Sequence, residues 1–325
     1  PVGLIGGAII SGAYFGDKMS PLSDTTNLAP AMAGTDLFTH IRYMMYTTIP
    51  SFSIALILFL IIGFRSNIIG TENIDELLQT LNTSFNITPW LFVVPVLVII
   101  LIVKKTPAIP ALLAGSVLGG VFAILFQPNI ITEISGEASV TISSSYKAVI
   151  NAMSTDISIT TNNNQINDLL TSGGMYGMLN TIWLIICAMI FGGILESTGL
   201  LRRIAEPIIN YAKSTGSLVA TTTGTCIFFN ITASDQYISI VVPGRMFADS
   251  YKEKGLAPEN LSRTLEDSGT VTSVLIPWNT CGATQSAVLG VATLSYLPYC
   301  FFNLISPIMT IIYAYLGIKI KKLRE

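Results

Sequence analysis

The polar sequence GDKMSPLSDTTNLAP at residues 16–30 directly follows an apolar run at residues 2–14, and this change of character is the main clue to the architecture. About 13 helical residues rise only about 20 Å, which is short of the roughly 30 Å hydrocarbon core of a bilayer. If the apolar run enters a bilayer, the polar stretch therefore lies near mid-depth. Charged side chains at that depth usually face a partner, an ion or a water-filled cavity. The alternative is a solvated loop at the membrane surface.

The composition supports a membrane setting. Of the 325 residues, 51% are hydrophobic and 11% are charged, whereas soluble domains carry roughly 25% charged residues. The net charge of −2 and the lack of a basic face argue against nucleic-acid binding. The four cysteines stand singly, without metal-site spacing, and are interpreted as small core residues. We predict an all-α integral membrane protein.

Five apolar runs are predicted to span the membrane, at residues 43–64, 90–103, 108–126, 175–195 and 299–318. Two further apolar segments are interrupted by polar residues, Gly and Pro. We interpret residues 215–247 as a re-entrant hairpin and residues 261–297 as a broken helix. With this topology most of the 17 Lys and Arg residues fall on one side, which is typical of the cytoplasmic face.

An internal similarity appears when the chain is shifted by 256 residues, which places Pro21 on Pro277 and Gly34 on Gly290. Each copy has an apolar half-helix, a polar break containing Pro, a small-residue half-helix, a turn and a span. The copies are expected to have opposite orientations, and inverted repeats with broken helices are typical of secondary transporters. The predicted organisation is residues 1–64 as the second part of inverted repeat 1, 65–88 as a loop on the acidic side, 89–318 as inverted repeat 2, and 319–325 as a basic cytoplasmic tail.

The polar breaks supply candidate ion ligands. The second break, EDSGTVTSVLIPWNTCGA at residues 266–283, contains Pro277, which frees backbone carbonyls one turn earlier. Carboxylate, amide and hydroxyl oxygens suit a hard cation such as sodium rather than a soft metal. The predicted sodium ligands are Asp17, Ser20, Ser23, Asp24, Thr25, Asn27, Asn230, Thr232, Asp235, Gln236, Asp267, Ser268, Thr270, Asn279 and Thr280.

Two carboxylates are candidates for carrying the proton, Asp24 in the first break and Asp235 at the hairpin tip. A carboxylate that binds either a proton or a cation couples the two. The alternative for Asp235 is capping of the following half-helix. His40 is interpreted as an interfacial anchor, with a role in a proton path left open.

Other classes have little support in the sequence. There is no P-loop, no G-x-S-x-G elbow and no H-E-x-x-H motif, so neither an ATP-driven pump nor a hydrolase is indicated. A channel would need a polar stripe through several helices, which the apolar spans do not show. We predict a transporter without enzymatic activity or cofactor.

The breaks also carry a resemblance. GDKMSPLSDTTNLAP with AGTDLFTHIRYMMYTTIP (residues 33–50), DQYISIVVPGRMF (residues 235–247) and EDSGTVTSVLIPWNTCGA resemble motifs of NhaC-type sodium/proton antiporters of the ion transporter superfamily. The resemblance implies a multi-pass antiporter of the inner, cytoplasmic membrane that exchanges sodium for protons by alternating access. Its implied partners are the lipid bilayer, sodium and protons, and a homodimer is left open.

Similar family members exchange malate for lactate with sodium and protons, so an organic-acid exchanger is the alternative. Neither break contains an Arg to clamp a carboxylate, which favours a cation substrate, and Lys18 is the counter-argument. The chain starts at Pro1, and the family pattern leads us to expect a missing hairpin before it. Ion ligands from that hairpin would lie outside this sequence.

Overall fold

The computed structural model describes residues 2–21, 23–65, 74–104, 106, 108–159, 161, 167, 170–200, 203 and 214–323. In these residues the chain is helical, and β-structure is limited to the isolated bridges Ile157–Ser172 and Leu256–Lys322. The predicted all-α class is confirmed. The chain divides into two compact units, residues 1–66 with 181–325 and residues 67–180, and each is described by itself.

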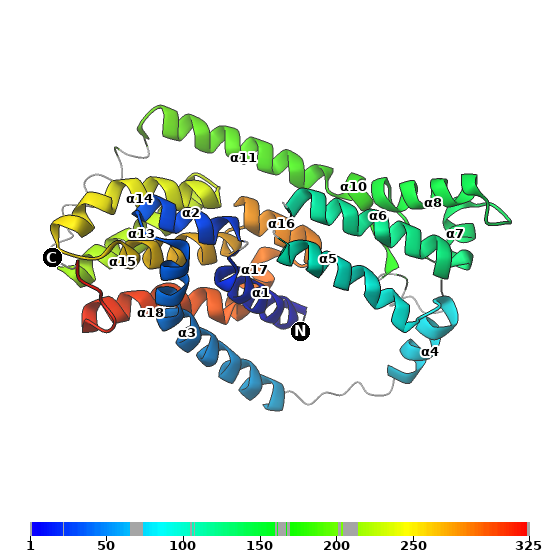
Figure 1. Cartoon of the computed structure of the whole chain (residues 1–325), viewed down its shortest axis with the longest axis horizontal. Helices are drawn as coiled ribbons and strands as arrows, with labels where there is room; N and C mark the ends of the chain where they lie inside the picture. The colour runs from blue at the N-terminus through cyan, green and yellow to red at the C-terminus, as the bar shows by residue number, and fades with distance from the viewer. Residues whose placement is uncertain are drawn as a thin grey trace. The chain divides into compact units, whose positions relative to one another are not determined.

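The first unit begins with helix α1 (Val2–Met19), a four-residue break and helix α2 (Asp24–Ala33), as Figure 1 shows in blue. Ser23 caps α2, because its side chain accepts a hydrogen bond from the backbone N–H of Thr26. Gly34 ends the helix in the left-handed conformation, with φ of 82°. The long helix α3 (Leu37–Arg65) follows. The first polar break is thus a break between two helices.

Helices α13 (Thr215–Thr232) and α14 (Gln236–Glu253) form a helical hairpin, in which they pack against each other. The turn between them is residues 233–235, and Ser234 has a positive φ of 59°. Asp235 caps α14. The segment predicted as a hairpin therefore has hairpin geometry, and its re-entry into a membrane remains a prediction.

The predicted broken helix at residues 261–297 consists of several short elements. Helix α15 (Pro258–Leu265) continues into a π-helical turn, η2 (Glu266–Thr270), and a 3₁₀ turn, η3 (Ser273–Leu275). After the break come α16 (Thr280–Leu289), α17 (Thr293–Tyr296), the 3₁₀ turn η4 (Leu297–Tyr299) and α18 (Phe301–Leu316). A π-helical turn inside a helix often marks a functional site.

The element bounds repeat along the chain. Each of these pairs differs by the same 256 positions: Asp24 with Thr280 at a helix start, Ala33 with Leu289 at its end, and Leu37 with Thr293 after the turn. Gly34 and Gly290 both adopt the left-handed conformation. The copies differ in two respects. Helix α1 is a continuous α-helix, whereas residues 258–275 change to π and 3₁₀ winding, and α3 is continuous, whereas its counterpart is divided into α17, η4 and α18.

The core of this unit has two large apolar clusters and a smaller one around Phe229 and Ala233. One joins α2, α13, α14 and α15, and includes Phe247 and Leu265. The other joins α1, η3, α17 and α18, and includes Ile10 and Phe302. The π-helical turn η2 and most of α15 are buried although their sequences are polar. Buried polar backbone and side chains need internal hydrogen-bond partners, so this segment is a natural place for a site.

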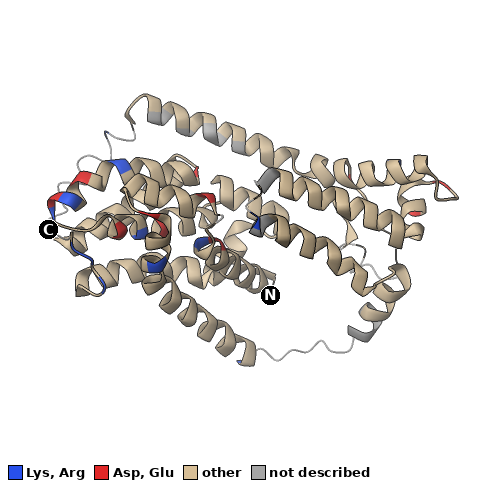
Figure 2. Ribbon diagram, viewed as in Figure 1, with Lys and Arg blue, Asp and Glu red and all other residues tan. Residues whose placement is uncertain are grey.

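The second unit contains α4 (Ile74–Ser84), η1 (Pro89–Phe92), α5 (Val93–Val103), α6 (Ala108–Phe126), α7 (Pro128–Ser135), α8 (Ile142–Ser154) and α10 (Gly174–Gly177). Helices α5 and α6 pack closely, and a Cβ added at Gly115 would lie 2.8 Å from the Val98 side chain. These two helices carry almost no charge in Figure 2. Helix α4 lies inside the predicted loop at residues 65–88, of which residues 66–73 are outside the described part.

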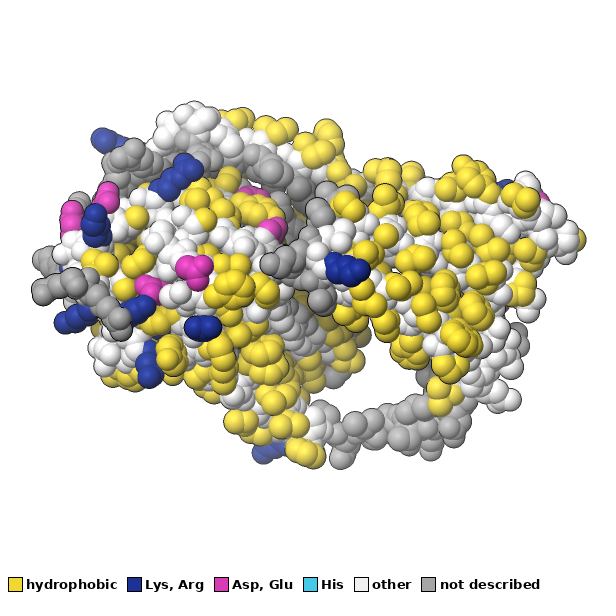
Figure 3. All heavy atoms as spheres, in the orientation of Figure 1, with side chains coloured by type: hydrophobic (Ala, Val, Ile, Leu, Met, Phe, Trp, Pro, Cys, Tyr) yellow, Lys and Arg dark blue, Asp and Glu magenta, His cyan; other side chains and the backbone are white. Residues whose placement is uncertain are grey.

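All five predicted spans fall on helices: the first on α3, then α5, α6, α11 (Leu179–Ser197) and α18. Among the described residues, α3 is the one helix that is long and apolar enough by length and composition to cross a membrane, and up to four spans result if each of three bent helix pairs counts as one. Many of their large hydrophobic side chains are exposed, as the yellow surface over α3 in Figure 3 illustrates. The protein is a membrane protein.

Candidate functional site

The three polar segments meet at one cavity of about 400 Å³ in the first unit. Each broken helix and the hairpin contribute to its wall. Its lining consists of Ala13, Tyr14, Asp17, Asp24, Gln236, Tyr237, Thr280, Cys281, Thr284 and Gln285. We call this space the polar cavity.

Two carboxylates give the polar cavity a negative charge. Asp17 lies in the last turn of α1 and Asp24 begins α2, and both are exposed. The lining includes neither Lys nor Arg. Because the carboxylates face no basic side chain of the wall, the cavity attracts a cation.

Asp24 is positioned by two hydrogen bonds. Its Oδ2 accepts one from the Tyr237 hydroxyl of α14, and its Oδ1 accepts one from the backbone N–H of Thr25 at 2.8 Å. A carboxylate in the first turn of α2 also benefits from the helix dipole. The carboxylate is thus held at the junction between α2 and the hairpin.

The hairpin tip is attached to the second helix break. The carbonyl oxygen of Ser234 accepts a hydrogen bond from the backbone N–H of Thr280 at 3.0 Å. The Asn279 amide donates to the Asn230 side-chain and backbone oxygens, both at 3.1 Å. Asn230 in turn donates to the carbonyl of Gly269 at 2.7 Å. These predicted ligands therefore join the hairpin to the break, and Asn279 also caps α16.

Asp235 is buried at the hairpin tip and lies outside the lining of the polar cavity. Its Oδ1 accepts a hydrogen bond from the backbone N–H of Ile238 at 3.0 Å. The structure thus shows the capping arrangement that was the alternative to a proton-carrying role.

Several predicted hydroxyl and amide ligands bond to nearby backbone. Asn27 donates to the carbonyls of Pro21 at 2.9 Å and Ser23 at 2.6 Å. The Thr232 hydroxyl donates to the carbonyl of Phe228 at 2.8 Å, one turn earlier. The hydroxyls of Ser23 and Thr25 lie 3.1 Å apart in a hydrogen bond, and the backbone N–H of Ser20 bonds to the carbonyl of Asp17 at 3.0 Å.

A second group of charges lies apart from the polar cavity, in the buried interior. Lys18 forms an ion pair with Asp267, and both side chains are fully buried. The Ser306 hydroxyl of α18 lies 3.2 Å from the Lys18 nitrogen and 3.1 Å from Asp267 Oδ1. We call Lys18, Asp267, Ser306 and the adjoining Glu266 the buried charge cluster. Of the other predicted ligands in this segment, the Ser268 hydroxyl donates to the carbonyl of Thr264.

Glu266 was missed by the sequence analysis. It is fully buried, and neither carboxylate oxygen has a hydrogen-bond partner among the described residues. The Thr270 hydroxyl, one turn later, is buried and unbonded in the same part of the chain. The signal that could have identified Glu266 is its position beside Asp267 inside an apolar segment. An acidic side chain is costly there, so its presence indicates a functional role.

Other lining residues were missed as well. Tyr237 and Thr284 follow polar breaks by only one turn of helix, which is the signal that could have found them. Cys281 lines the polar cavity and lies in hydrogen-bond contact with Gln236 at 2.6 Å. Cys281 is partly buried and also packs against the second core cluster. The interpretation as a core residue was wrong for the exposed Cys187 and is confirmed for the buried Cys226 and Cys300.

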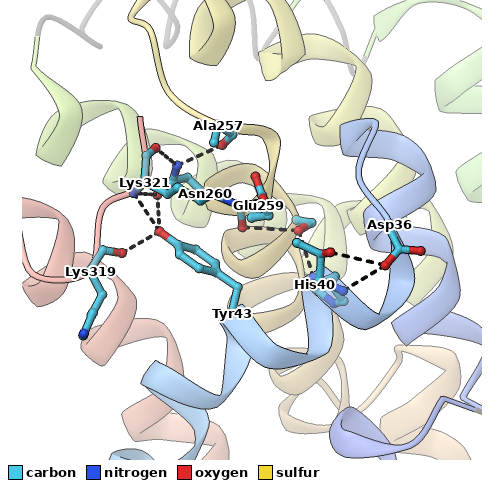
Figure 4. A network of polar contacts seen from close by, with 10 residues as sticks. Asp36, His40, Tyr43, Ala257, Glu259, Asn260, Lys319 and Lys321 are labelled. Atoms are coloured by element: carbon cyan, nitrogen blue, oxygen red, sulfur yellow. Dashed lines mark hydrogen bonds and ion pairs between the residues drawn. The ribbon is translucent and has the colours of Figure 1, made fainter. Parts of the chain in front are cut away.

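The expectation that His40 is an interfacial anchor was also wrong, because its side chain is fully buried. Its Nδ1 lies 2.8 Å from the Ser262 hydroxyl of α15. Figure 4 shows His40 beside a larger network, in which Tyr43 contacts Asn260 and the backbone of Lys319. This network joins α3 and α15 to the segment that follows α18.

Comparison with known proteins places this geometry in a family. The chain is 38% identical over 316 residues to the Na(+)/H(+) antiporter NhaC of Alkalihalophilus pseudofirmus, covering 97% of this chain and 65% of that protein. It is 35% identical to NhaC of Bacillus subtilis, covering 96% of this chain and 66% of that one. It is also 35% identical to a malate-2H(+)/Na(+)-lactate antiporter of Bacillus subtilis, covering 98% of this chain and 65% of that protein.

The chain thus spans about two thirds of the length of these relatives. No solved structure matches it. A family profile described as the Na+/H+ antiporter family matches residues 12–318. The chain therefore belongs to the Na+/H+ antiporter family.

Proposed function

We propose that the protein containing this chain exchanges sodium ions for protons across the cytoplasmic membrane by alternating access. The observation that carries the proposal is the polar cavity, in which Asp17 and Asp24 face a space without lining Lys or Arg. Hydroxyl and amide oxygens from the hairpin and the second break complete the set of hard ligands. Two relatives of this chain are named as Na(+)/H(+) antiporters, which agrees with the proposal. Enzymatic activity has no part in this proposal.

Within the polar cavity, sodium would be held by Asp17 and Asp24, with Thr280 and Gln236 contributing oxygen atoms. These four line the same space, whereas Asp267 is bound to Lys18 and Ser306. The remaining predicted ligands shape the helix ends around the site.

The proton would compete with sodium for Asp24. When sodium leaves, the carboxylate and the Tyr237 hydroxyl remain close, and a proton can neutralise the negative charge. Mutually exclusive occupancy of one carboxylate is sufficient to couple the two ions. Asp235 stays a candidate, although it caps α14.

Glu266 is a third candidate for the proton. A buried carboxylate without a hydrogen bond is costly as an anion, so it tends to hold a proton or a cation. The ion pair of Lys18 with Asp267 leaves Glu266 as the acidic group of the buried charge cluster without a partner in the described residues.

Alternating access would use the repeated helix breaks. The agreement of helix bounds at an offset of 256 residues supports two copies of one folding unit, which we propose lie inverted in the membrane. Each break then presents the polar cavity to one side of the membrane. The scaffold spans and a homodimer stay predictions.

The competing function is organic-acid exchange, which the name of the malate and lactate relative favours. An organic carboxylate needs a cationic partner. Lys18 is engaged with Asp267, and the described cavity wall offers no other cation. This arrangement favours sodium itself as the substrate.

The test is sodium-evoked proton movement in vesicles that contain the full-length protein. Asp24→Asn is expected to abolish the response, whereas Asp249→Asn, an exposed carboxylate of α14 outside the polar cavity, is expected to leave it unchanged. Glu266→Gln decides whether the buried carboxylate also carries protons. A response that needs added malate or lactate would reject sodium/proton exchange in favour of the organic-acid exchanger, and a normal response from Asp24→Asn would reject the proposed site.

A further inference from the structure

A second hollow lies where α3 begins and where the chain leaves α18. It has a volume of about 410 Å³ and shares no lining residue with the polar cavity. Arg42 lies on one side, and Lys319 and Lys321 lie on the other, with the rings of Tyr43 and Tyr46 in the wall. The lining contains no acidic residue. We call it the basic hollow.

The backbone that carries the two lysines is held in place by buried groups. The carbonyl of Lys321 accepts hydrogen bonds from the Asn260 amide at 2.6 Å and from the backbone N–H of Ala257 at 2.9 Å. The carbonyl of Lys319 accepts one from Arg263 at 3.2 Å and another from the Tyr43 hydroxyl. Figure 4 shows these contacts meeting at Tyr43. The basic hollow is therefore preorganised, which lowers the entropy cost of binding a ligand.

The charge behind the hollow is also positive. Arg263 is fully buried, and its guanidinium lies 4.6 Å from the centre of the Tyr43 ring. Its Nε and Nη2 atoms have no hydrogen-bond partner in the described chain. The nearby acids are Glu259, which pairs with Lys321, and Asp36, which bonds to Thr39. Glu259 offsets the charge of Lys321. The three cations Arg42, Lys319 and Arg263 then exceed the one remaining acid, Asp36, so the net charge around the hollow is positive.

Apolar surface begins beside the basic hollow. Helices α3 and α18 pack together, and their exposed side chains include Ile49 of α3 and Ile312 and Leu316 of α18. In the described part of the chain, α3 is the single helix long and apolar enough to cross a membrane by itself, and the hollow lies at its first turns. Tyr46 and Tyr315 are exposed at this level, as is typical of aromatic residues at a membrane interface.

We propose that the basic hollow binds the phosphate headgroup of an anionic phospholipid, whose acyl chains lie on the exposed apolar faces of α3 and α18. Arg42 and Lys319 contact the phosphate, and the Arg42 guanidinium can form paired hydrogen bonds to its oxygens. Basic pockets between membrane helices on the cytoplasmic side are suited to anionic headgroups. The continuity of charge and apolar surface favours a lipid over a soluble phosphate.

The test measures lipid retained by the purified full-length protein after exchange into detergent with equal amounts of phosphatidylglycerol and phosphatidylcholine. Native mass spectrometry counts the bound lipids. The wild-type protein is expected to retain phosphatidylglycerol selectively. The double variant Arg42→Gln with Lys319→Gln is expected to bind phosphatidylglycerol at least roughly tenfold more weakly, because two headgroup contacts are lost.

A matched control removes the same charge elsewhere. Arg245→Gln with Lys252→Gln changes two exposed cations of α14 outside the basic hollow, and is expected to retain lipid as the wild type does. The charge-conserving pair Arg42→Lys with Lys319→Arg is expected to keep most of the selectivity. Equal losses in the two Gln pairs would reject a specific site.

Two further outcomes would overturn the proposal. If the wild-type protein retained phosphatidylcholine as well as phosphatidylglycerol, the hollow would not distinguish lipids by the charge of their headgroup. Displacement of phosphatidylglycerol by millimolar inorganic phosphate would assign the hollow to a soluble anion. Because lipid retention does not require transport, this result and that of the antiport experiment are independent.

Discussion

Asp17 and Lys18 are neighbours in the chain but belong to two different electrostatic regions. Asp17 is exposed and lines the polar cavity, whereas Lys18 is fully buried and paired with Asp267. Successive residues on an α-helix point about 100° apart. The end of α1 thus separates an open carboxylate from a buried cation within a single residue step.

Removing a charged side chain is expected to have different consequences in the two regions. In the polar cavity the charges stay in contact with solvent or an ion, so the loss of one changes binding more than stability. In the buried charge cluster each charge depends on the others, and removing one partner leaves an uncompensated charge. Transport chemistry is therefore expected to be sensitive at the first region, and folding at the second.

The largest effect is expected for Lys18→Met. It leaves the Asp267 carboxylate buried without its cation, which costs roughly 3–5 kcal/mol of unfolding free energy. The measurement is reversible unfolding of the full-length protein in detergent. Adding Asp267→Asn to Lys18→Met should recover part of the loss. Unchanged stability of the single variant would show that the ion pair does not stabilise the fold.

A smaller loss is expected for Ser306→Ala, because its hydroxyl contacts both members of the buried ion pair. Hydrogen bonds to charged groups are worth about 1.5–3 kcal/mol, and unfolding in detergent should show a loss in that range. Thr284→Ala, at the wall of the polar cavity, serves as the comparison and should lose less. A reversed order would break the distinction between the two regions.

In the polar cavity, Tyr237→Phe removes the hydrogen bond to Asp24. A hydrogen bond worth about 1 kcal/mol corresponds to roughly a fivefold change in affinity. The apparent sodium affinity of proton exchange should therefore change by about that factor, while the unfolding free energy stays nearly constant. A stability loss as large as that of Ser306→Ala, with normal sodium affinity, would contradict a role at the cation.

The smallest effect on stability is expected for Asp17→Asn. Exposed positions usually change the unfolding free energy by less than about 0.5 kcal/mol, and Asp17 makes no ion pair in the described structure. The measurement is the unfolding free energy of Asp17→Asn in detergent, compared with that of Lys18→Met. The comparison is informative because the two residues are adjacent in the chain. Similar losses in both variants would mean that the helix end, rather than the charge, decides stability.

The helix breaks could be predicted because their signals are local. Ser23 and Asn279 cap the helices that follow them, and Gly34 and Gly290 end those helices. Capping depends on hydrogen bonds to backbone groups two or three residues away, so the sequence contains the whole interaction. The hairpin turn and the equal helix bounds of the two copies follow from signals of the same kind.

The assignment of partners needed the tertiary structure. Lys18 pairs with Asp267, and Tyr237 reaches Asp24, across more than 200 residues. Nothing in the local sequence says that Asp267 is bound to a lysine, that the Glu266 carboxylate has no hydrogen-bond partner among the described residues, or that His40 is buried. Local hydrogen bonding decides where helices start and stop, but the packing of distant helices decides which charges become desolvated and which remain open to an ion.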